Sequence, residues 1–203
     1  MRLLHKLLTV LCVLALSVTA FAAEAPYYTM TELYDGRYAY TQSGYLPDGT
    51  FRDFGGDSLK RPADVFVDEL DRLFISDEGN DRVVMATLDG ETIRVFGEDD
   101  FKSVGGIYVR EGKLYATDVK KKAVFVYDTE TGENVFTLEH PGTPLYGVNA
   151  KFEPLKVSVD SAGNIYVISK GNPNGIAQFS KDGTFLGYFG ANDTVLSLSE
   201  KIK

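Results

Sequence analysis

RPADVFVDELDRLFISDEGNDRVVMATLDG, residues 61–90, contains three short runs that are rich in β-branched and aromatic residues. The runs lie at 63–67, 72–76 and 82–86, and the segments between them are rich in turn-forming Asp, Gly and Asn. A fourth run, 92–96, follows the turn at 88–90. Four strands of about five residues joined by tight turns predict one small antiparallel sheet. Such a sheet cannot bury both of its faces alone, so it needs neighbours of the same kind.

Those neighbours follow in the sequence. The pattern returns at 104–138 and again at 154–190, where Asp118 and Ser169 stand in the place of Asp77. A unit of four strands that recurs with a period of about 40–45 residues is typical of β-propeller blades. We therefore predict an all-β fold of propeller blades. The predicted boundaries are 57–98, 99–139 and 154–190 for three blades, with an insertion loop at 140–153.

The region before the first blade predicts half of another one. The sequence Asp-Gly-Thr-Phe at 48–51 reappears at 182–185, where it forms a hairpin turn that leads into an outer strand. Residues 34–56 are therefore predicted to be a half blade, preceded by a linker at 23–33.

The end of the chain predicts no further blade. Val195, Leu198 and Ile202 share one face of a possible helix, so 191–203 is predicted to be a tail or the start of a helical insertion. Three and a half blades fall short of the about 4–8 blades of a closed ring. We expect an incomplete ring and the N-terminal part of a longer protein; a closed ring of four blades is the alternative.

Residues 1–22 predict a cleaved secretory signal peptide. Arg2 and Lys6 form a basic start, an apolar run extends from Leu7 to Val18, and Ala20-Phe21-Ala22 fits an A-x-A cleavage site. The apolar run is shorter than the about 20 residues of a membrane span, so an uncleaved anchor is the less favoured alternative. We expect a protein that is secreted or associated with the cell envelope, outside the cytoplasmic membrane.

The acidic net charge of the chain argues against one class of binding partner. The chain carries a formal net charge of −8, and removal of the leader with its two basic residues makes it more acidic. Nucleic-acid binding needs a basic surface, so we expect no nucleic-acid partner. The leader also contains the only cysteine, Cys12, so the exported domain would depend on packing and strand pairing for its stability.

DEGNDRV, residues 77–83, resembles the turn of NHL repeats, which carry D-x-G-N-x-R after a strand and P-x-D-V-x-V-D before it. The matching residues are Pro62, Asp64, Val65, Val67, Asp68, Ile75, Asp77, Gly79, Asn80 and Arg82. The second copy departs from the pattern at 120–122, and the third has Ser169 in place of Asp. The resemblance covers about 61–190 and implies a propeller that binds a partner, with catalysis much less common.

The whole layout is similar to that of exported NHL proteins of Gram-positive bacteria, which belong with the gluconolactonase-like propellers. These proteins have a signal peptide, a tyrosine-rich opening and a phrase like Gly-Tyr-Phe-Gly-Ala-Asn, here 187–192, before a helical insertion. They are longer than this chain, which supports the expectation of an incomplete ring.

Six residues are predicted to shape turns. Asp accepts backbone N–H groups in a turn, and Gly and Asn tolerate the left-handed backbone that corners require. These structural turn residues are Asp77, Gly79, Asn80, Asp160, Gly163 and Asn164. Arg82 is a candidate binding residue, although a bridge from its guanidinium to a carboxylate or carbonyl of a neighbouring blade is the favoured interpretation.

Tyrosines form the other candidate binding set. Tyr34, Tyr38 and Tyr40 lie in the tyrosine-rich opening, and Tyr146 lies in the long insertion loop. Exposed tyrosines can stack on sugars or hold a peptide. The alternative, without a binding role, is that the tyrosine-rich opening forms a packed outer strand and an N-terminal strap.

We expect a non-enzymatic binding or scaffold propeller whose partner is a protein, a peptide or a cell-wall glycan. No catalytic residue, metal site or cofactor is predicted, because the sequence shows no ligand-spaced motif and no G-x-S-x-G. His140, the only histidine after the leader, is expected to be solvated. The alternative is a metal-dependent lactonase or esterase of the gluconolactonase-like group. A third hypothesis is an ectodomain of a membrane transport complex, attached through a missing C-terminal part.

Overall fold

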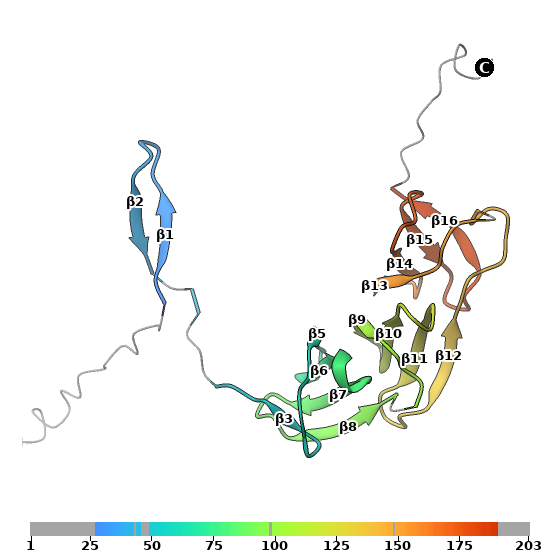
Figure 1. Ribbon diagram of the computed structural model, residues 1–203, viewed down its shortest axis with the longest axis horizontal. Coiled ribbons are helices and arrows are strands. Elements are labelled where there is room, and N and C mark those ends of the chain that lie inside the picture. The colour runs from blue at the N-terminus through green and yellow to red at the C-terminus, as the bar shows by residue number, and fades with distance from the viewer. Residues whose placement is uncertain (1–26, 43, 46–48, 98, 148, 191–203) are drawn as a thin grey trace, which may run out of the picture. The chain divides into compact units, whose positions relative to one another are not determined.

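The computed structural model describes residues 27–42, 44–45, 49–97, 99–147 and 149–190 (Figure 1). The predicted signal peptide and the predicted tail at 191–203 lie outside these residues. The chain divides into two compact units, 1–50 and 51–203. Within the described residues, no helix is long and apolar enough to cross a membrane.

The second unit contains three four-stranded antiparallel sheets, each with its strands in chain order. They lie one after another along the chain in Figure 1. Blade 1 is β5 (Pro62–Val67), β6 (Arg72–Asp77), β7 (Arg82–Thr87) and β8 (Thr92–Phe96); blade 2 is β9 (Val104–Arg110), β10 (Lys113–Asp118), β11 (Ala123–Asp128) and β12 (Asn134–Leu138); blade 3 is β13 (Pro154–Val159), β14 (Ile165–Ser169), β15 (Ile176–Phe179) and β16 (Phe185–Phe189). The prediction of an all-β fold with three four-stranded blades is confirmed.

Blade 2 is buried between blades 1 and 3, because alternate residues of a strand point to opposite faces. In β10, Leu114 and Ala116 face blade 1, where they share a buried apolar cluster with Phe74 and Val83. The residue between them, Tyr115, belongs to a second cluster that joins blade 2 to Val157, Val167 and Phe179 of blade 3, which gives the sheet two apolar faces.

The inner strand β9 of blade 2 lies next to β5 of blade 1 and β13 of blade 3. A Cβ atom added to Gly106 of β9 would lie 2.5 Å from the carbonyl oxygen of Leu155 in β13. Glycine is therefore required here because the backbones of two blades approach each other more closely than a side chain allows.

The region before blade 1 differs from the predicted half blade. Within the predicted linker lies β1 (Thr29–Glu32), which pairs with β2 (Tyr38–Thr41) through a turn that contains Gly36 at φ +77°. A separate two-stranded pair follows, β3 (Asp53–Phe54) with β4 (Asp57–Ser58). The strands within 34–56 thus pair with neighbours outside that range, because the local turn around Gly36 closes a hairpin that the repeat pattern does not contain.

The β3–β4 segment covers part of the face of blade 1 that points away from blade 2. Phe54 is buried with Ile75, Val84 and Ala86 in a third apolar cluster. Val65 and Val67 of β5 remain exposed.

Candidate binding site

The D-x-G-N-x-R turn of blade 1 is a buried hydrogen-bonded network. The carboxylate of Asp77 accepts hydrogen bonds from Arg82 Nε at 2.9 Å, from Asn80 Nδ2 at 2.7 Å and from the backbone N–H of Lys60 at 2.7 Å. A Cβ atom at Gly79 would lie 2.5 Å from the carbonyl oxygen of Lys60, so only glycine fits. Asp77, Gly79 and Asn80 therefore lie in a turn, as the sequence predicted, but its left-handed backbone falls on Asp81, at φ +50°, and not on Gly79 or Asn80.

Arg82 is not an exposed contact residue. Its side chain is only 5 % exposed, and Asp77 beside it is fully buried. The guanidinium donates hydrogen bonds to the carbonyl oxygens of Phe54 and Asp57, each at 3.2 Å. Arg82 thus fastens the β3–β4 segment to blade 1, so its bridge runs to this segment and not to a neighbouring blade, and its buried side chain cannot contact a ligand.

A different turn, between β13 and β14 of blade 3, is held by the carboxylate of Asp160. Asp160 accepts the side-chain N–H of Asn164 at 2.9 Å and the backbone N–H groups of Asn164 and Ala162 at 2.8 and 2.9 Å. These hydrogen bonds, the side chain of Asn164 first, hold the pKa of Asp160 below its ordinary value, although desolvation acts in the opposite direction. Gly163 takes the left-handed backbone with φ +84°.

Tyr146 was predicted to bind a ligand, and the structure corrects this prediction. The residue is fully buried, and its ring packs among Phe152, Phe179 and Phe185. Its hydroxyl donates to the carbonyl of Lys151 at 3.2 Å, while its own carbonyl accepts the hydroxyl of Tyr188 at 2.6 Å. Tyr146 therefore anchors the insertion loop to blade 3, because its large apolar ring gains more from burial than from exposure.

The anchored loop forms one wall of a surface pocket of about 490 Å³. Its lining residues are Lys122, His140, Asn149, Ala150, Lys151, Phe152 and Glu153. Both ring nitrogens of His140 are engaged: Nδ1 accepts the backbone N–H of Gly142 at 3.0 Å, and Nε2 lies 3.1 Å from the carbonyl oxygen of Ala150. In this arrangement Nε2 carries the proton, and the imidazole links the backbone of Gly142 to that of Ala150 within the loop.

The β1–β2 hairpin presents tyrosines on one face. Tyr40 stands opposite Met30 and Tyr38 opposite Glu32, so these four side chains share a face. Tyr28 extends the same face, with its ring 5.6 Å from that of Tyr40 in an edge-to-face contact. We call Tyr28, Met30, Tyr38 and Tyr40 the tyrosine face; all four are exposed.

Two of the predicted binding residues, Tyr38 and Tyr40, thus lie together. Tyr34 is fully exposed and lies between the two strands of the hairpin. Alternation of tyrosine with small residues at 38–40 could have revealed the shared face. Among the described residues, no group of three or more His, Cys, Asp or Glu side chains could hold a metal ion.

Comparison with solved structures shows the fold. No family model and no curated protein sequence matches the chain. The structure is similar to that of a streptogramin B lyase, with a TM-score of 0.54 and 20% identity over 79% of this chain and 53% of the lyase. It is also similar to a catalytically inactive virginiamycin B lyase from Staphylococcus aureus with quinupristin, with a TM-score of 0.53 and 15% identity over 84% and 57%.

A hydrazine synthase from Kuenenia stuttgartiensis matches with a TM-score of 0.53 and 14% identity over 73% of this chain and 40% of that chain. The chain therefore spans about half the length of these proteins, between 40% and 57%. Because the lyases are β-propeller proteins, the likeness shows that the three blades form part of a β-propeller.

Proposed function

We propose that this chain is an exported, non-enzymatic binding or scaffold propeller of NHL type. Its partner is a protein, a peptide or a cell-wall glycan outside the cytoplasmic membrane. The observation that carries the proposal is the tyrosine face of the β1–β2 hairpin. The NHL-like turn around Asp77 and the predicted signal peptide support the family and the location.

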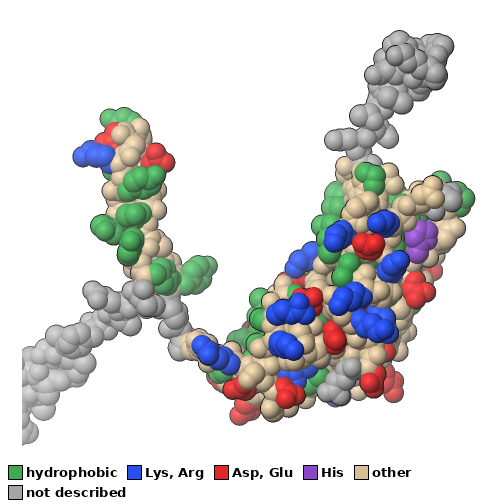
Figure 2. All heavy atoms as spheres, viewed as in Figure 1, with side chains coloured by type: hydrophobic (Ala, Val, Ile, Leu, Met, Phe, Trp, Pro, Cys, Tyr) green, Lys and Arg blue, Asp and Glu red, His purple; other side chains and the backbone are tan. Residues whose placement is uncertain are grey.

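The tyrosine face has the chemistry of a recognition surface. Tyr28, Tyr38 and Tyr40 are 71%, 65% and 76% exposed, and Figure 2 shows hydrophobic side chains on the surface of this hairpin. Tyrosine offers a large apolar ring and a hydroxyl that forms hydrogen bonds, and it loses little conformational entropy on binding. A two-stranded hairpin is at best marginally stable in water by itself, so a partner that covers this face would also stabilise it.

The proposal is tested with the full chain, expressed from Met1 in a Gram-positive host. The exported protein is incubated with insoluble cell-wall glycan and, separately, with detergent-extracted envelope proteins coupled to beads. We expect the Tyr38→Ser/Tyr40→Ser variant to lose most of the binding to one of these two materials. Thr31→Ala, on the opposite face of the same strand pair, is the matched control and should bind normally.

Which material retains the protein distinguishes a glycan from a protein or peptide partner. Equal binding by the wild type and the Tyr38→Ser/Tyr40→Ser variant would show that the tyrosine face is not the contact surface. Recovery of the chain only from the cytoplasm would contradict export.

A further inference from the structure

A groove with a volume of about 210 Å³ lies between blades 2 and 3, separate from the tyrosine face. It is lined by Arg110, Glu111, Lys113, Tyr115, Val159, Ser161, Ala162, Gly163 and Lys181. Arg110 ends β9 and Lys113 begins β10, and these two residues stand directly opposite each other in the sheet. Lys181 comes from the turn between β15 and β16, so cations of two blades meet at one groove.

Carboxylates compensate these charges only in part: Asp128 interacts electrostatically with Lys113, which it faces across the sheet, and Asp182 with Lys181. Like charges directly opposite each other on one face of a sheet repel and destabilise the pairing. Glu111 is the one acidic residue among those that line the groove. Its carboxylate forms an ion pair with Arg110, 3.7 Å from Nε and without a hydrogen bond, and its side chain is 77% exposed.

Arg110 also carries a buried donor that has no acceptor. Its Nε atom is inaccessible to solvent and has no hydrogen-bond partner among the described residues. Arg72, by contrast, donates to the carboxylates of Asp68 and Glu130, each at 2.7 Å. A buried donor without an acceptor is costly, and because Nε is inaccessible, a ligand in the groove would bind the other nitrogens of Arg110, whose side chain is 28% exposed.

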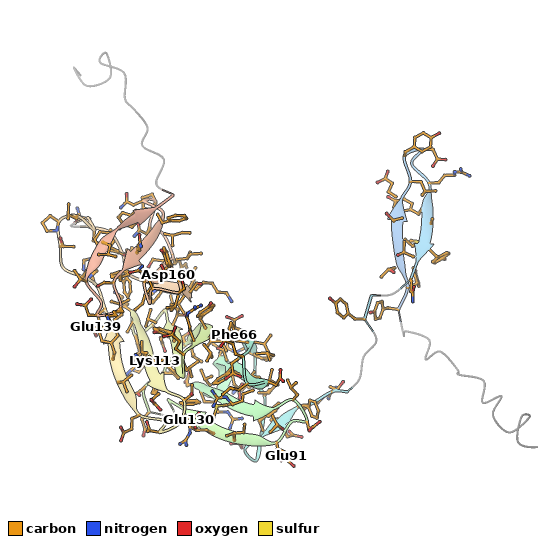
Figure 3. All side chains as sticks on the ribbon, turned by 180° about the vertical axis from the view of Figure 1, so that it is seen from behind. Phe66, Glu91, Lys113, Glu130, Glu139 and Asp160 are labelled. Carbon is orange, nitrogen blue, oxygen red and sulfur yellow. The ribbon has the colours of Figure 1, made fainter. Side chains whose placement is uncertain are left out.

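Two nearby carboxylates outside the groove, those of Asp128 and Asp160, accept hydrogen bonds within their own turns. Asp128, the other cross-strand neighbour of Lys113, accepts the backbone N–H groups of Glu130 and Thr131 at 2.9 and 2.8 Å. Asp160 accepts hydrogen bonds from Asn164 and from the hydroxyl of Tyr166. Figure 3 labels Lys113 on blade 2 and Asp160 on blade 3. These hydrogen bonds tie both carboxylates to their own turns.

The remaining lining residues fit an anion. Burial and, to a lesser degree, the charge of Glu111 raise the pKa of Tyr115, so its hydroxyl stays protonated and can donate. Ser161 adds a second hydroxyl, and the buried Val159 supplies an apolar wall. The volume is smaller than the about 300–1,000 Å³ of sites that enclose a whole small molecule. The groove therefore suits a charged group that hangs from a larger molecule.

We propose that this groove binds a pendant oxyanion, a carboxylate or phosphate group, held by Arg110, Lys113 and Lys181. The planar guanidinium provides the paired donors that both groups accept, and the two ammonium groups add point charges. The proposal is independent of the tyrosine face, because it concerns different residues on a different unit of the chain.

Isothermal titration of the full chain at constant ionic strength tests the proposal. The probes are glucuronate, glycerol phosphate and the neutral methyl glucoside. We expect saturable binding of at least one anion and none of methyl glucoside, and the tighter anion identifies a carboxylate or a phosphate ligand. Lys181→Gln, an exposed turn residue, should weaken binding about tenfold, as loss of one charge-assisted hydrogen bond predicts.

Arg110→Gln should weaken binding by at least as much, and Lys122→Gln, an exposed lysine on a different hairpin, should leave it unchanged. Circular dichroism on each variant separates a loss of binding from a loss of fold, and Lys181→Gln keeps the test open should Arg110→Gln fail to fold. Wild-type affinity in Lys181→Gln, equal affinity for methyl glucoside, or no saturable binding of either anion would overturn the proposal.

Discussion

Asp64 of blade 1 and Lys156 of blade 3 form an ion pair, with Lys156 Nζ 2.8 Å from Asp64 Oδ2. The same carboxylate oxygen accepts the backbone N–H of Ile107 in blade 2 at 2.9 Å. One side chain therefore joins the inner strands of three successive blades. Asp64 is 21% exposed and Lys156 is 53% exposed, so the backbone hydrogen bond is better shielded from water than the ion pair.

Asp64→Ala is expected to lower the free energy of unfolding by about 1–3 kcal/mol, because it leaves the N–H of Ile107 without its acceptor. Lys156→Ala should cost no more than about 1 kcal/mol, since a half-exposed ion pair is screened by solvent. Urea unfolding followed by circular dichroism measures both changes. A larger loss in Lys156→Ala than in Asp64→Ala would show that the ion pair is the main contribution.

Arg82→Met is expected to lower the free energy of unfolding by about 3–5 kcal/mol, because it leaves the buried carboxylate of Asp77 without its charged partner. Arg37→Met is the control: its ion pair with Asp35 is short, at 2.6 Å, but the Arg37 side chain is 79% exposed. Limited proteolysis should also show faster cleavage of Arg82→Met near the β3–β4 segment. Equal stability of the two variants would contradict the fastening role of Arg82.

Gly106→Ala is expected to destabilise the protein by about 1–3 kcal/mol, because the added methyl group overlaps the backbone of blade 3 and must push the blades apart. Gly44→Ala is the control, since a Cβ atom there meets nothing within 4 Å. Thermal unfolding of the two variants compares them. An unchanged melting temperature in Gly106→Ala would mean that the two inner strands can separate at little cost.

Acid should weaken the turn at Asp160. The pKa of Asp160 in the folded protein lies below its ordinary value of 3.8, chiefly because of the hydrogen bond from the Asn164 side chain. The stabilisation is therefore present above the unfolded pKa and is lost as the pH falls through the folded pKa. We expect the difference in unfolding free energy between wild type and Asp160→Asn to shrink between about pH 6 and pH 2.5.

Ser161→Ala keeps the Asp160 carboxylate and serves as the control for that experiment. Its unfolding free energy should follow the wild-type dependence on pH. A constant difference between wild type and Asp160→Asn over the whole range would show that the carboxylate does not contribute through its charge.

The candidate site was predictable only in part. Asp77, Gly79 and Asn80 could be assigned to a turn from sequence because their roles depend on neighbours within a few residues. Tyr146 could not be assigned, because an aromatic residue in a long loop has the same local sequence whether it is buried or exposed. The contacts of Tyr146 with Phe179 and Tyr188 come from strands that follow it in the chain, and the sequence does not give their position.

The same limit applies to the opening of the chain. Tyr38 and Tyr40 were predicted as binding candidates from their residue type, but their common face depends on the register of β2 with β1. The turn at Gly36 sets that register, and the repeat pattern contains no such turn. A local hairpin therefore replaced the strand pairing expected for 34–56.

The sequence alone determined the three four-stranded blades. Strand period, turn residues and repeat length are local properties, and they recur in each of the three copies. Tertiary structure alone decided which charges meet. The β9–β10 hairpin places Arg110 opposite Lys113, and only the packing of blade 2 against blade 3 brings Lys181 to the same groove. Asp64, Ile107 and Lys156 meet for the same reason: the inner strands of consecutive blades converge, and contacts between them depend on distance in space and not on distance in sequence.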